Sequence, residues 1–103
     1  MPARITMDAA RLGELCRRWK IERFELFGSV LRDDFGPASD IDVLVTFTAE
    51  ATWSLFDFVR CKDELEGFFG RRVDLLTRRA VERSRNVYRR KAILDAAEAI
   101  HGS

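Results

Sequence analysis

The sequence predicts an α/β (α+β) domain in which a small sheet is flanked by helices. Three stretches rich in β-branched and aromatic residues fit strands, at residues 21–27, 40–47 and 72–77. Stretches with apolar residues at helical spacing alternate with them, at 9–20, 53–69 and 87–100. Helices interleaved with strands over 103 residues are typical of one layered domain, which we expect to span residues 1–103.

Composition narrows the classes of function. Apolar residues make up 47% of the chain, and basic and acidic residues nearly cancel, leaving a net charge of +1. A nucleic-acid binder usually has a basic excess, so we expect no direct nucleic-acid binding. Cys16 and Cys61 form no C-x-x-C pair and are expected to be reduced thiols in the core. With no apolar run of ~20 residues and no signal-like N-terminus, the sequence predicts a soluble cytoplasmic protein without a membrane partner.

The first helix and the first strand have clear boundaries in the sequence. Asp8 can cap a helix over 9–20, because its carboxylate can accept hydrogen bonds from free backbone N–H groups of the first turn. The strand over 21–27 follows, and Gly28 is expected to end it.

The next segment leads to the second strand. Ser29 can cap a short helix over 30–34, and residues 35–39 have the composition of a turn. The strand over 40–47 follows. Its alternation is expected to place Ile41, Val43 and Val45 on the face opposite the acids Asp40 and Asp42.

The second half contains two longer helices. The helix over 53–69 is expected to end at Gly70, a typical C-cap. Its predicted apolar face consists of Leu55, Phe58, Val59, Leu65, Phe68 and Phe69. The final helix is expected over 87–100, and His101 is expected to be a frayed terminal residue.

Asp40 and Asp42 are the first candidates for chemistry. They are two residues apart at the start of a strand, so both carboxylates should point to one face. Two acids this close repel each other unless a cation or a shared proton offsets the repulsion. Mg²⁺ prefers oxygen ligands and often binds through a few carboxylates and substrate phosphates. The pair is a candidate metal site, although alone it also fits a capped turn before a strand.

Gly28 and Ser29 are the second candidates, because they precede a helix whose free N–H groups and positive end suit a phosphate. Gly28 would let the backbone approach closely, and the Ser29 hydroxyl could donate a hydrogen bond to a phosphate oxygen. Arg32 could add positive charge one turn later. A surface ion pair with Asp33 or Asp34 is the alternative for this arginine.

The spacing of these residues is more specific than any one of them. Ten residues separate Ser29 from Asp40, and the string Gly-Ser-x10-Asp-x-Asp resembles the signature of the nucleotidyltransferase superfamily with the polymerase-β-type fold. Asp74 occupies the position of that superfamily's third acid. Together with the strings Ser-Asp-Ile-Asp-Val-Leu-Val and Gly-Arg-Arg-Val-Asp-Leu-Leu-Thr, the chain most resembles the minimal nucleotidyltransferase (MNT) family over about residues 22–78. The implied fold has a small mixed sheet.

The resemblance implies a site and a reaction. The implied catalytic and Mg²⁺-binding acids are Asp40, Asp42 and Asp74. The implied nucleotide-binding residues are Gly28, Ser29 and Arg32. The implied reaction transfers AMP from ATP and releases pyrophosphate, with Asp74 assisting deprotonation of the attacking hydroxyl. All three acids are present, so the resemblance implies an active enzyme.

The resemblance also implies a protein partner. MNT proteins of this size are often antitoxins that resemble protein adenylyltransferases and modify a tyrosine of a HEPN-domain RNase toxin. The toxin's own Arg-x4–6-His motif is absent here, because no arginine precedes His101, the single histidine, at that spacing. The chain is therefore expected to be the antitoxin, with the toxin and a nucleoside triphosphate as partners.

Other readings remain open in the sequence. The chain could be a non-catalytic antitoxin that neutralises by binding, or a nucleotidyltransferase acting on a small molecule such as an aminoglycoside. Enzymes of the latter kind usually carry an additional helical domain, for which 103 residues leave little room. The basic run over 78–91 fits a solvated helix face or an electrostatic surface for a partner. Tyr88 fits either the core or a contact with a nucleotide base.

Overall fold

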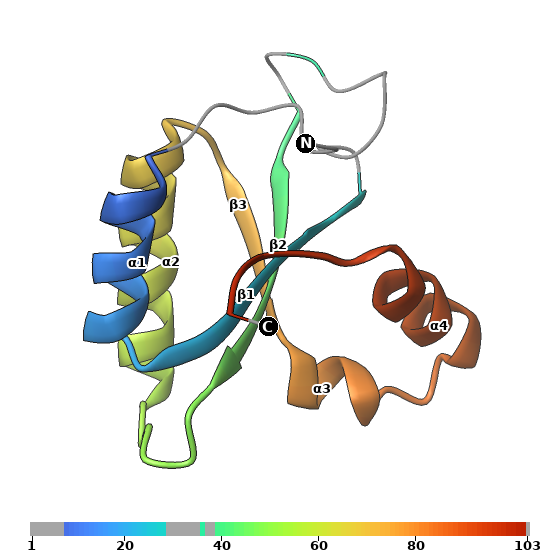
Figure 1. Ribbon diagram of the computed structural model, residues 1–103. Coiled ribbons are helices and arrows are strands. Elements are labelled where there is room, and N and C mark those ends of the chain that lie inside the picture. Colours follow the sequence, from blue (N-terminus) through green and yellow to red (C-terminus); the bar gives the residue numbers. More distant parts are fainter. Residues whose placement is uncertain (1–7, 29–35, 37–38, 103) are drawn as a thin grey trace.

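The computed structural model describes residues 8–28, 36 and 39–102. Its elements, shown in Figure 1, are α1 (Ala9–Arg18), β1 (Ile21–Phe27), β2 (Ile41–Phe47), α2 (Leu55–Phe69), β3 (Val73–Thr77), α3 (Arg78–Glu82), α4 (Val87–Ala96) and β4 (Glu98–His101). The short helix predicted over 30–34 and the capping role of Ser29 lie outside the described residues. The strands and helices predicted up to residue 77 are confirmed to within two residues at each end.

The four strands form one mixed sheet in the order β3-β2-β1-β4. β1 pairs antiparallel with both β2 and β4, whereas β2 and β3 are parallel. Helices α1 and α2 pack on one face of the sheet, and α3 and α4 lie on the other side (Figure 1). The predicted small mixed sheet flanked by helices is therefore confirmed.

The larger hydrophobic core lies between the sheet and the helices α1 and α2. The sheet contributes Phe24, Leu26, Ile41, Val43, Val45, Val73 and Leu75, and the helices contribute Leu12, Leu15, Cys16, Cys61 and Leu65. A smaller core on the opposite face joins Phe27, Leu44, Val81 and Ile93. The predicted alternation in β2 is thus confirmed, because its odd-numbered residues face the larger core and Leu44 faces the other way.

Cys16 and Cys61 are both fully buried and free, as the sequence predicts. Burial disfavours the charged thiolate and raises the pKa of Cys16 to about 11 and that of Cys61 to about 12. Both residues therefore act as packing groups. No helix within the described residues is long and apolar enough to cross a bilayer.

The predicted caps Asp8 and Gly70 are present, and the structure adds a capping box at Ser54 that was not predicted. The Asp8 carboxylate accepts hydrogen bonds from two backbone N–H groups at the start of α1. Ser54 and Asp57 form a reciprocal capping box at the start of α2, and Gly70 ends this helix in the left-handed region with φ 67°. These local signals set the length of α2 and hence the point at which β3 begins.

The apolar face predicted for α2 is too wide. Leu65 is buried, and Phe58, Phe68 and Phe69 pack against the larger core, but Leu55 and Val59 are exposed. The buried stripe is centred on Cys61 and Leu65, which lie one turn apart. Leu55 and Val59 lie on its flank, beyond the arc that meets the sheet.

The C-terminal segment also differs from the prediction of one helix over 87–100. α4 ends at Ala96, and Ala97 is extended with ψ 133°. Residues 98–101 then form β4 along the open edge of β1, where cross-strand pairing satisfies backbone groups better than local helical propensity does. His101 lies in β4 opposite Phe24, so the prediction of a frayed residue is wrong.

A buried carboxylate ties α3 to the sheet. Glu25 on β1 is 1% exposed, and its Oε1 accepts a 2.8 Å hydrogen bond from Arg78 Nη1. Arg23 Nε lies 3.3 Å from the same oxygen but makes no aligned hydrogen bond, so it contributes charge. Arg78 also lies 3.4 Å from Glu82. The first residue of the basic run is therefore a structural group and not part of a solvated face.

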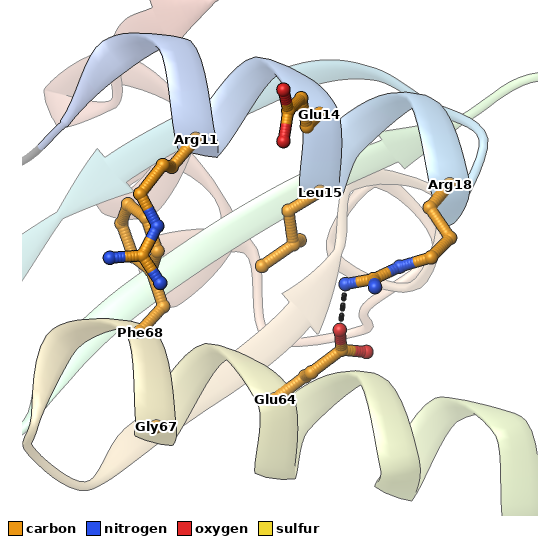
Figure 2. Close-up of a pocket in the computed structure, with 7 residues that line it drawn as sticks. All are labelled: Arg11, Glu14, Leu15, Arg18, Glu64, Gly67 and Phe68. Carbon is orange, nitrogen blue, oxygen red and sulfur yellow. Dashed lines mark hydrogen bonds and ion pairs between the residues drawn. The ribbon is translucent and has the colours of Figure 1, made fainter.

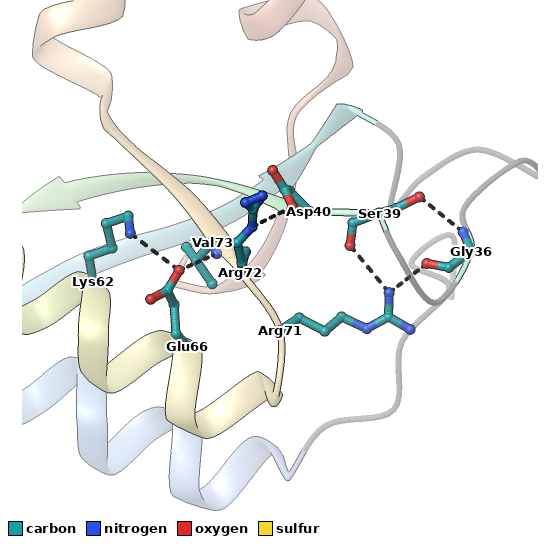
Figure 3. Close-up of polar contacts among 8 residues, drawn as sticks. All are labelled: Gly36, Ser39, Asp40, Lys62, Glu66, Arg71, Arg72 and Val73. Atoms are coloured by element: carbon teal, nitrogen blue, oxygen red, sulfur yellow. Dashed lines mark hydrogen bonds and ion pairs between the residues drawn. The ribbon is translucent and has the colours of Figure 1, made fainter.

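Glu66 fixes the connection from α2 to β3, as Figure 3 shows. Its Oε2 accepts the backbone N–H of Val73 at 2.9 Å and the Lys62 ammonium at 3.2 Å. These donors, the Val73 N–H first, lower the pKa of Glu66 because they stabilise the ionised form. The first backbone group of β3 is thereby satisfied from the preceding helix.

Arg78→Met tests the buried ion pair. Removing the guanidinium leaves the Glu25 carboxylate buried without its hydrogen-bond donor, and we expect the free energy of unfolding to fall by about 3 kcal/mol. Urea unfolding followed by circular dichroism measures this. The matched control is Arg79→Met, at an exposed position, which should change the free energy by less than ~0.5 kcal/mol. Equal losses in both variants would contradict the structural role of Arg78.

Glu66→Gln tests the contact between Glu66 and the Val73 N–H, because the stabilisation from this contact depends on pH. The pKa of Glu66 is lower in the folded protein than in the unfolded chain, so its stabilisation is complete above the ordinary value of 4.5. The stabilisation is lost as pH falls through the folded-state value. The variant should therefore unfold at a lower urea concentration than the wild type at pH 7, and the difference should shrink below pH 4.5.

The control for this titration is Asp63→Asn on the exposed side of α2, where the side chain has no hydrogen-bond or ion-pair partner among the described residues. It should leave the urea midpoint unchanged at every pH. A difference between Glu66→Gln and wild type that stays constant down to pH 3 would refute the account.

Candidate functional site

Two of the predicted acids are brought together by strand register. Asp42 on β2 and Asp74 on β3 are direct partners in the parallel pair. Both belong to the face of the sheet that carries Leu44 and Leu76, away from the larger core. Asp42 is half-buried and Asp74 is exposed. Like charges on directly opposite residues destabilise a sheet, so this arrangement favours a cation as a third participant.

Asp40 lies just before β2, two residues from Asp42. Its side chain is about half exposed, and its Oδ1 lies 3.7 Å from Arg72 Nε (Figure 3). The arginine is itself largely exposed, and an ion pair between two exposed groups contributes little to stability. Arg72 therefore offsets part of the negative charge of the acids without fixing Asp40 in place.

Gly28 lies against Asp42 at the end of β1, because Phe27 is the cross-strand partner of Asp42. The backbone of Gly28 is left-handed, with φ 73°. A Cβ atom at this position would lie 2.1 Å from Asp42 Oδ2, far inside van der Waals contact. The structure thus shows a close approach of Gly28 to the Asp42 carboxylate, which only glycine permits; the predicted approach of this backbone to a phosphate stays a prediction.

The loop between α2 and β3 holds the segment that carries Asp40 (Figure 3). Arg71 Nη1 donates to the carbonyl oxygens of Gly36 at 2.7 Å and of Ser39 at 3.4 Å. The backbone N–H of Ile41 donates to the Arg72 carbonyl oxygen at 2.9 Å. Side chain and backbone of this loop therefore position the start of β2, and with it Asp40.

Gly36 and Ser39 are also bound to each other. The Ser39 N–H donates to the Gly36 carbonyl oxygen at 3.0 Å, and the Gly36 N–H donates to Ser39 Oγ at 3.1 Å. These bonds fit the turn predicted over 35–39, of which only these two residues are described. The carbonyl oxygens that Arg71 binds are thus held in a fixed position.

Arg71 and Arg72 were not predicted as site residues. Their signal was the pair of basic residues directly after the Gly70 cap and directly before the strand of Asp74. Two other predicted residues, Ser29 and Arg32, lie outside the described residues. The structure therefore brings Gly28, Asp42 and Asp74 together with Asp40 beside them.

The acids match Mg²⁺ in chemistry. Within residues 8–28, 36 and 39–102, no three histidine, cysteine, aspartate or glutamate side chains gather as a ready-made metal site. The carboxylate oxygens of Asp42 and Asp74 are nevertheless the ligand type that Mg²⁺ prefers, and Asp40 lies two residues from Asp42. Mg²⁺ usually keeps several waters and adds substrate phosphates, so it does not need a cage made only of protein.

A groove lies on the side of the sheet opposite Asp42 and Asp74. It has a volume of about 530 Å³ between α1 and α2, and is lined by Arg11, Glu14, Leu15, Arg18, Glu64, Gly67 and Phe68 (Figure 2). An ion pair between Arg18 and Glu64 crosses it. None of the predicted site residues that the structure describes lines this groove. The groove is therefore not the predicted nucleotide site.

The amino-acid sequence is similar to those of known protein adenylyltransferases and candidate members of that class. The chain is 46% identical over 57 residues to MJ0435, a candidate protein adenylyltransferase of Methanocaldococcus jannaschii, in a match that covers 55% of this chain. It is 35% identical over 69 residues to the protein adenylyltransferase MntA of Thermococcus cleftensis, with 67% of this chain covered. The matches span 59% and 68% of the lengths of these relatives.

Solved structures share the fold. One, of a candidate minimal nucleotidyltransferase, is 33% identical with a TM-score of 0.66, covering 87% of this chain and 86% of that one. A toxin–antitoxin structure with AMP-PNP has a TM-score of 0.70 at 19% identity, covering 94% and 75%. A complex of tri-AMPylated Shewanella oneidensis HEPN toxin with MNT antitoxin has a TM-score of 0.61 at 20% identity, covering 92% and 70%. The last two likenesses concern the fold alone.

The match to a family model covers most of the chain. The model describes the nucleotidyltransferase domain and matches residues 11–100. This range contains Gly28 and all three acids, as well as the four strands up to residue 100. The chain therefore belongs to the nucleotidyltransferase domain family.

Proposed function

We propose that this chain is an antitoxin that acts as a protein adenylyltransferase. It transfers AMP from ATP to a tyrosine of a cognate HEPN-domain RNase toxin and so neutralises it. The observation that carries the proposal is the register of β2 and β3, which sets Asp42 beside Asp74 with Asp40 two residues away. Family membership and the 35% identity to a protein adenylyltransferase support it.

The acids Asp40, Asp42 and Asp74 would hold Mg²⁺ together with the phosphates of ATP. Bound there, Mg²⁺ would neutralise charge on the attacking and leaving oxygens of an in-line displacement. Asp42 and Asp74 are direct cross-strand partners, and a divalent cation is the group that two neighbouring carboxylates would share. Gly28, with Ser29 and Arg32, would contact the triphosphate.

The transfer is a substitution at the α-phosphorus of ATP. The tyrosine oxygen forms a bond to this phosphorus, and the bond from the phosphorus to the oxygen bridging to the β-phosphate breaks. Pyrophosphate leaves with that oxygen and its electron pair. Asp74, the exposed member of the acid pair, would accept the phenolic proton. The product is AMP-tyrosine in a phosphodiester link.

Arg71 and Arg72 of the α2–β3 loop would support this chemistry by holding the segment that carries Asp40. Arg71 fixes the turn before β2 through the Gly36 and Ser39 carbonyl oxygens. Arg72 lies 3.7 Å from Asp40 and would offset part of the negative charge of the acids at this exposed position. The loop therefore positions the start of β2, and with it Asp40.

Asp40→Asn with Asp42→Asn tests the catalytic proposal. The wild type is incubated with ATP, Mg²⁺ and the HEPN-domain toxin, and the toxin is examined by intact mass. A gain of one or more AMP units on a tyrosine is expected, and the double variant should lose more than ~100-fold of the transfer rate because the metal ligands are gone. Asp63→Asn with Asp95→Asn, at exposed positions elsewhere, is the matched control.

The same variants separate catalysis from binding in cells. If the Asp40→Asn/Asp42→Asn variant protects cells from the toxin as well as the wild type does, occlusion suffices and the catalytic proposal fails. If the wild type adds no AMP to the toxin but adds it to an aminoglycoside, the acceptor is a small molecule.

Gly28→Ala tests the close approach to Asp42. A methyl group would overlap the Asp42 carboxylate and strain a left-handed backbone, so Asp42 must shift. We expect AMP transfer to fall by about 100-fold, since a displacement near 1 Å has such an effect on a positioned group. Transfer is measured by intact mass of the toxin, and thermal unfolding reports whether the fold is retained.

Gly67→Ala is the matched control, because nothing lies within 4 Å of a Cβ added there. It should keep full activity and gain ~0.5–1 kcal/mol of stability, since alanine favours a helix interior over glycine. Normal transfer by a folded Gly28→Ala protein would show that the contact has no catalytic consequence.

A further inference from the structure

Charge is divided unevenly along this chain. Residues 78–91 hold seven basic side chains and one acidic one, Glu82. Because the whole chain has a net charge of +1, the remaining residues together carry a net charge of −5. One segment of fourteen residues therefore supplies the positive field of an otherwise acidic molecule.

Most of these cations have no side-chain partner among residues 8–28, 36 and 39–102. Arg78 is engaged by Glu25 and Glu82, and Arg90 donates to the Ser84 carbonyl oxygen at 3.1 Å. The other five are exposed and form no side-chain hydrogen bond or ion pair with a described residue; they are Arg79, Arg83, Arg85, Arg89 and Lys91. Their charges are therefore available to a molecule outside the chain.

Apolar side chains lie among these cations. Val87 and Tyr88 form the first turn of α4 and are 54% and 89% exposed. Tyr88 is thus not a core residue, which removes one of its two sequence readings. An exposed aromatic beside arginines is the composition that protein interfaces concentrate at their centres.

The segment has a fixed place relative to the acids. α3 follows β3 without a loop and begins at Arg78, four residues after Asp74. Val81 of α3 and Ile93 of α4 pack with Phe27 and Leu44 on the acid face of the sheet. Figure 1 shows both helices on that side, opposite α1 and α2. A partner held by α3 and α4 would lie on the same side of the sheet as Asp42 and Asp74.

We infer that residues 79–91 form the docking surface for the protein acceptor, and that they take an acidic surface of it with an apolar contact at Val87 and Tyr88. The inference rests on the proposed protein adenylyltransferase function, and names how its acceptor is held. Unpaired cations attract an acidic surface and steer its approach, while the apolar pair supplies short-range contact. Five free positive charges on a chain of net charge +1 fit a partner with localised negative charge.

A protein fits this surface better than a single-stranded RNA does. Single-strand binding surfaces combine a basic groove with several aromatic side chains on which successive bases stack. Residues 78–91 contain one aromatic, Tyr88, and it stands beside the aliphatic Val87. Binding of a single-stranded RNA by this surface is one outcome that the experiment below can detect.

The experiment reverses three charges at once. Arg83→Glu/Arg85→Glu/Arg89→Glu is compared with Arg11→Glu/Arg17→Glu/Arg60→Glu, which makes the same charge change at exposed positions of α1 and α2. The binding constant for the HEPN-domain toxin is measured by calorimetry at 50 and 300 mM salt. The KM values for toxin and for ATP are measured by AMP transfer.

We expect Arg83→Glu/Arg85→Glu/Arg89→Glu to bind the toxin at least ~10-fold more weakly at low salt. Its KM for the toxin should rise by the same factor, and its KM for ATP should not change. The control variant should match the wild type in toxin affinity and in both KM values. Tyr88→Ala alone should weaken binding without changing its salt dependence. Thermal unfolding of every variant shows that the fold is intact, and Tyr88→Ala keeps the test valid if the triple variant does not fold.

The outcomes separate this inference from the proposed function. If the wild type transfers AMP but all variants bind the toxin alike, the docking inference is overturned and the proposed function stands. If the wild type binds but transfers no AMP, the proposed function fails, and the binding constants alone decide the docking surface. If the triple variant loses affinity for a single-stranded RNA oligonucleotide and not for the toxin, the surface is an RNA site and the inference is wrong.

Discussion

Parallel pairing between β2 and β3 places the carboxylates of Asp42 and Asp74 side by side, and much of the remaining structure serves to hold that register. The apolar residues of both strands face the larger core, so a slip by one residue would bury the acids and expose Ile41 and Val43. The Glu66 carboxylate accepts the first backbone N–H of β3, and the backbone carbonyl oxygen of Arg72 accepts the first backbone N–H of β2. Packing of apolar residues on the opposite face therefore holds the two acids in this register.

The α2–β3 loop links the helical layer to the acids. Gly70 ends α2 with a left-handed residue, and the next two residues are the arginines that contact the turn before β2 and Asp40. A loop of this length leaves little freedom between the last turn of α2 and the start of β3. The position of Asp40 therefore depends on where α2 ends, which its capping box and its glycine cap determine.

Local patterns in the sequence were sufficient for the elements that position the acids. Asp8 and Gly70 are capping residues whose effect is local, and β-branched alternation in β2 assigns its two faces. Three features depended on distant contacts and could not be predicted: the strand β4 at the edge of β1, the burial of Glu25, and the loop contacts of Arg71. The wide apolar face predicted for α2 was wrong because periodicity does not tell how much of a helix meets the sheet.

β4 has a consequence for the solubility of the molecule. Without it, β1 would be an outer strand whose N–H and C=O groups from Phe24 to Leu26 could template pairing with another chain. Four residues near the C-terminus cover this edge, and β4 itself is short and carries Glu98 at its start. A short strand with a charged residue is a poor template for further pairing, so the C-terminal residues protect the protein against edge-to-edge aggregation.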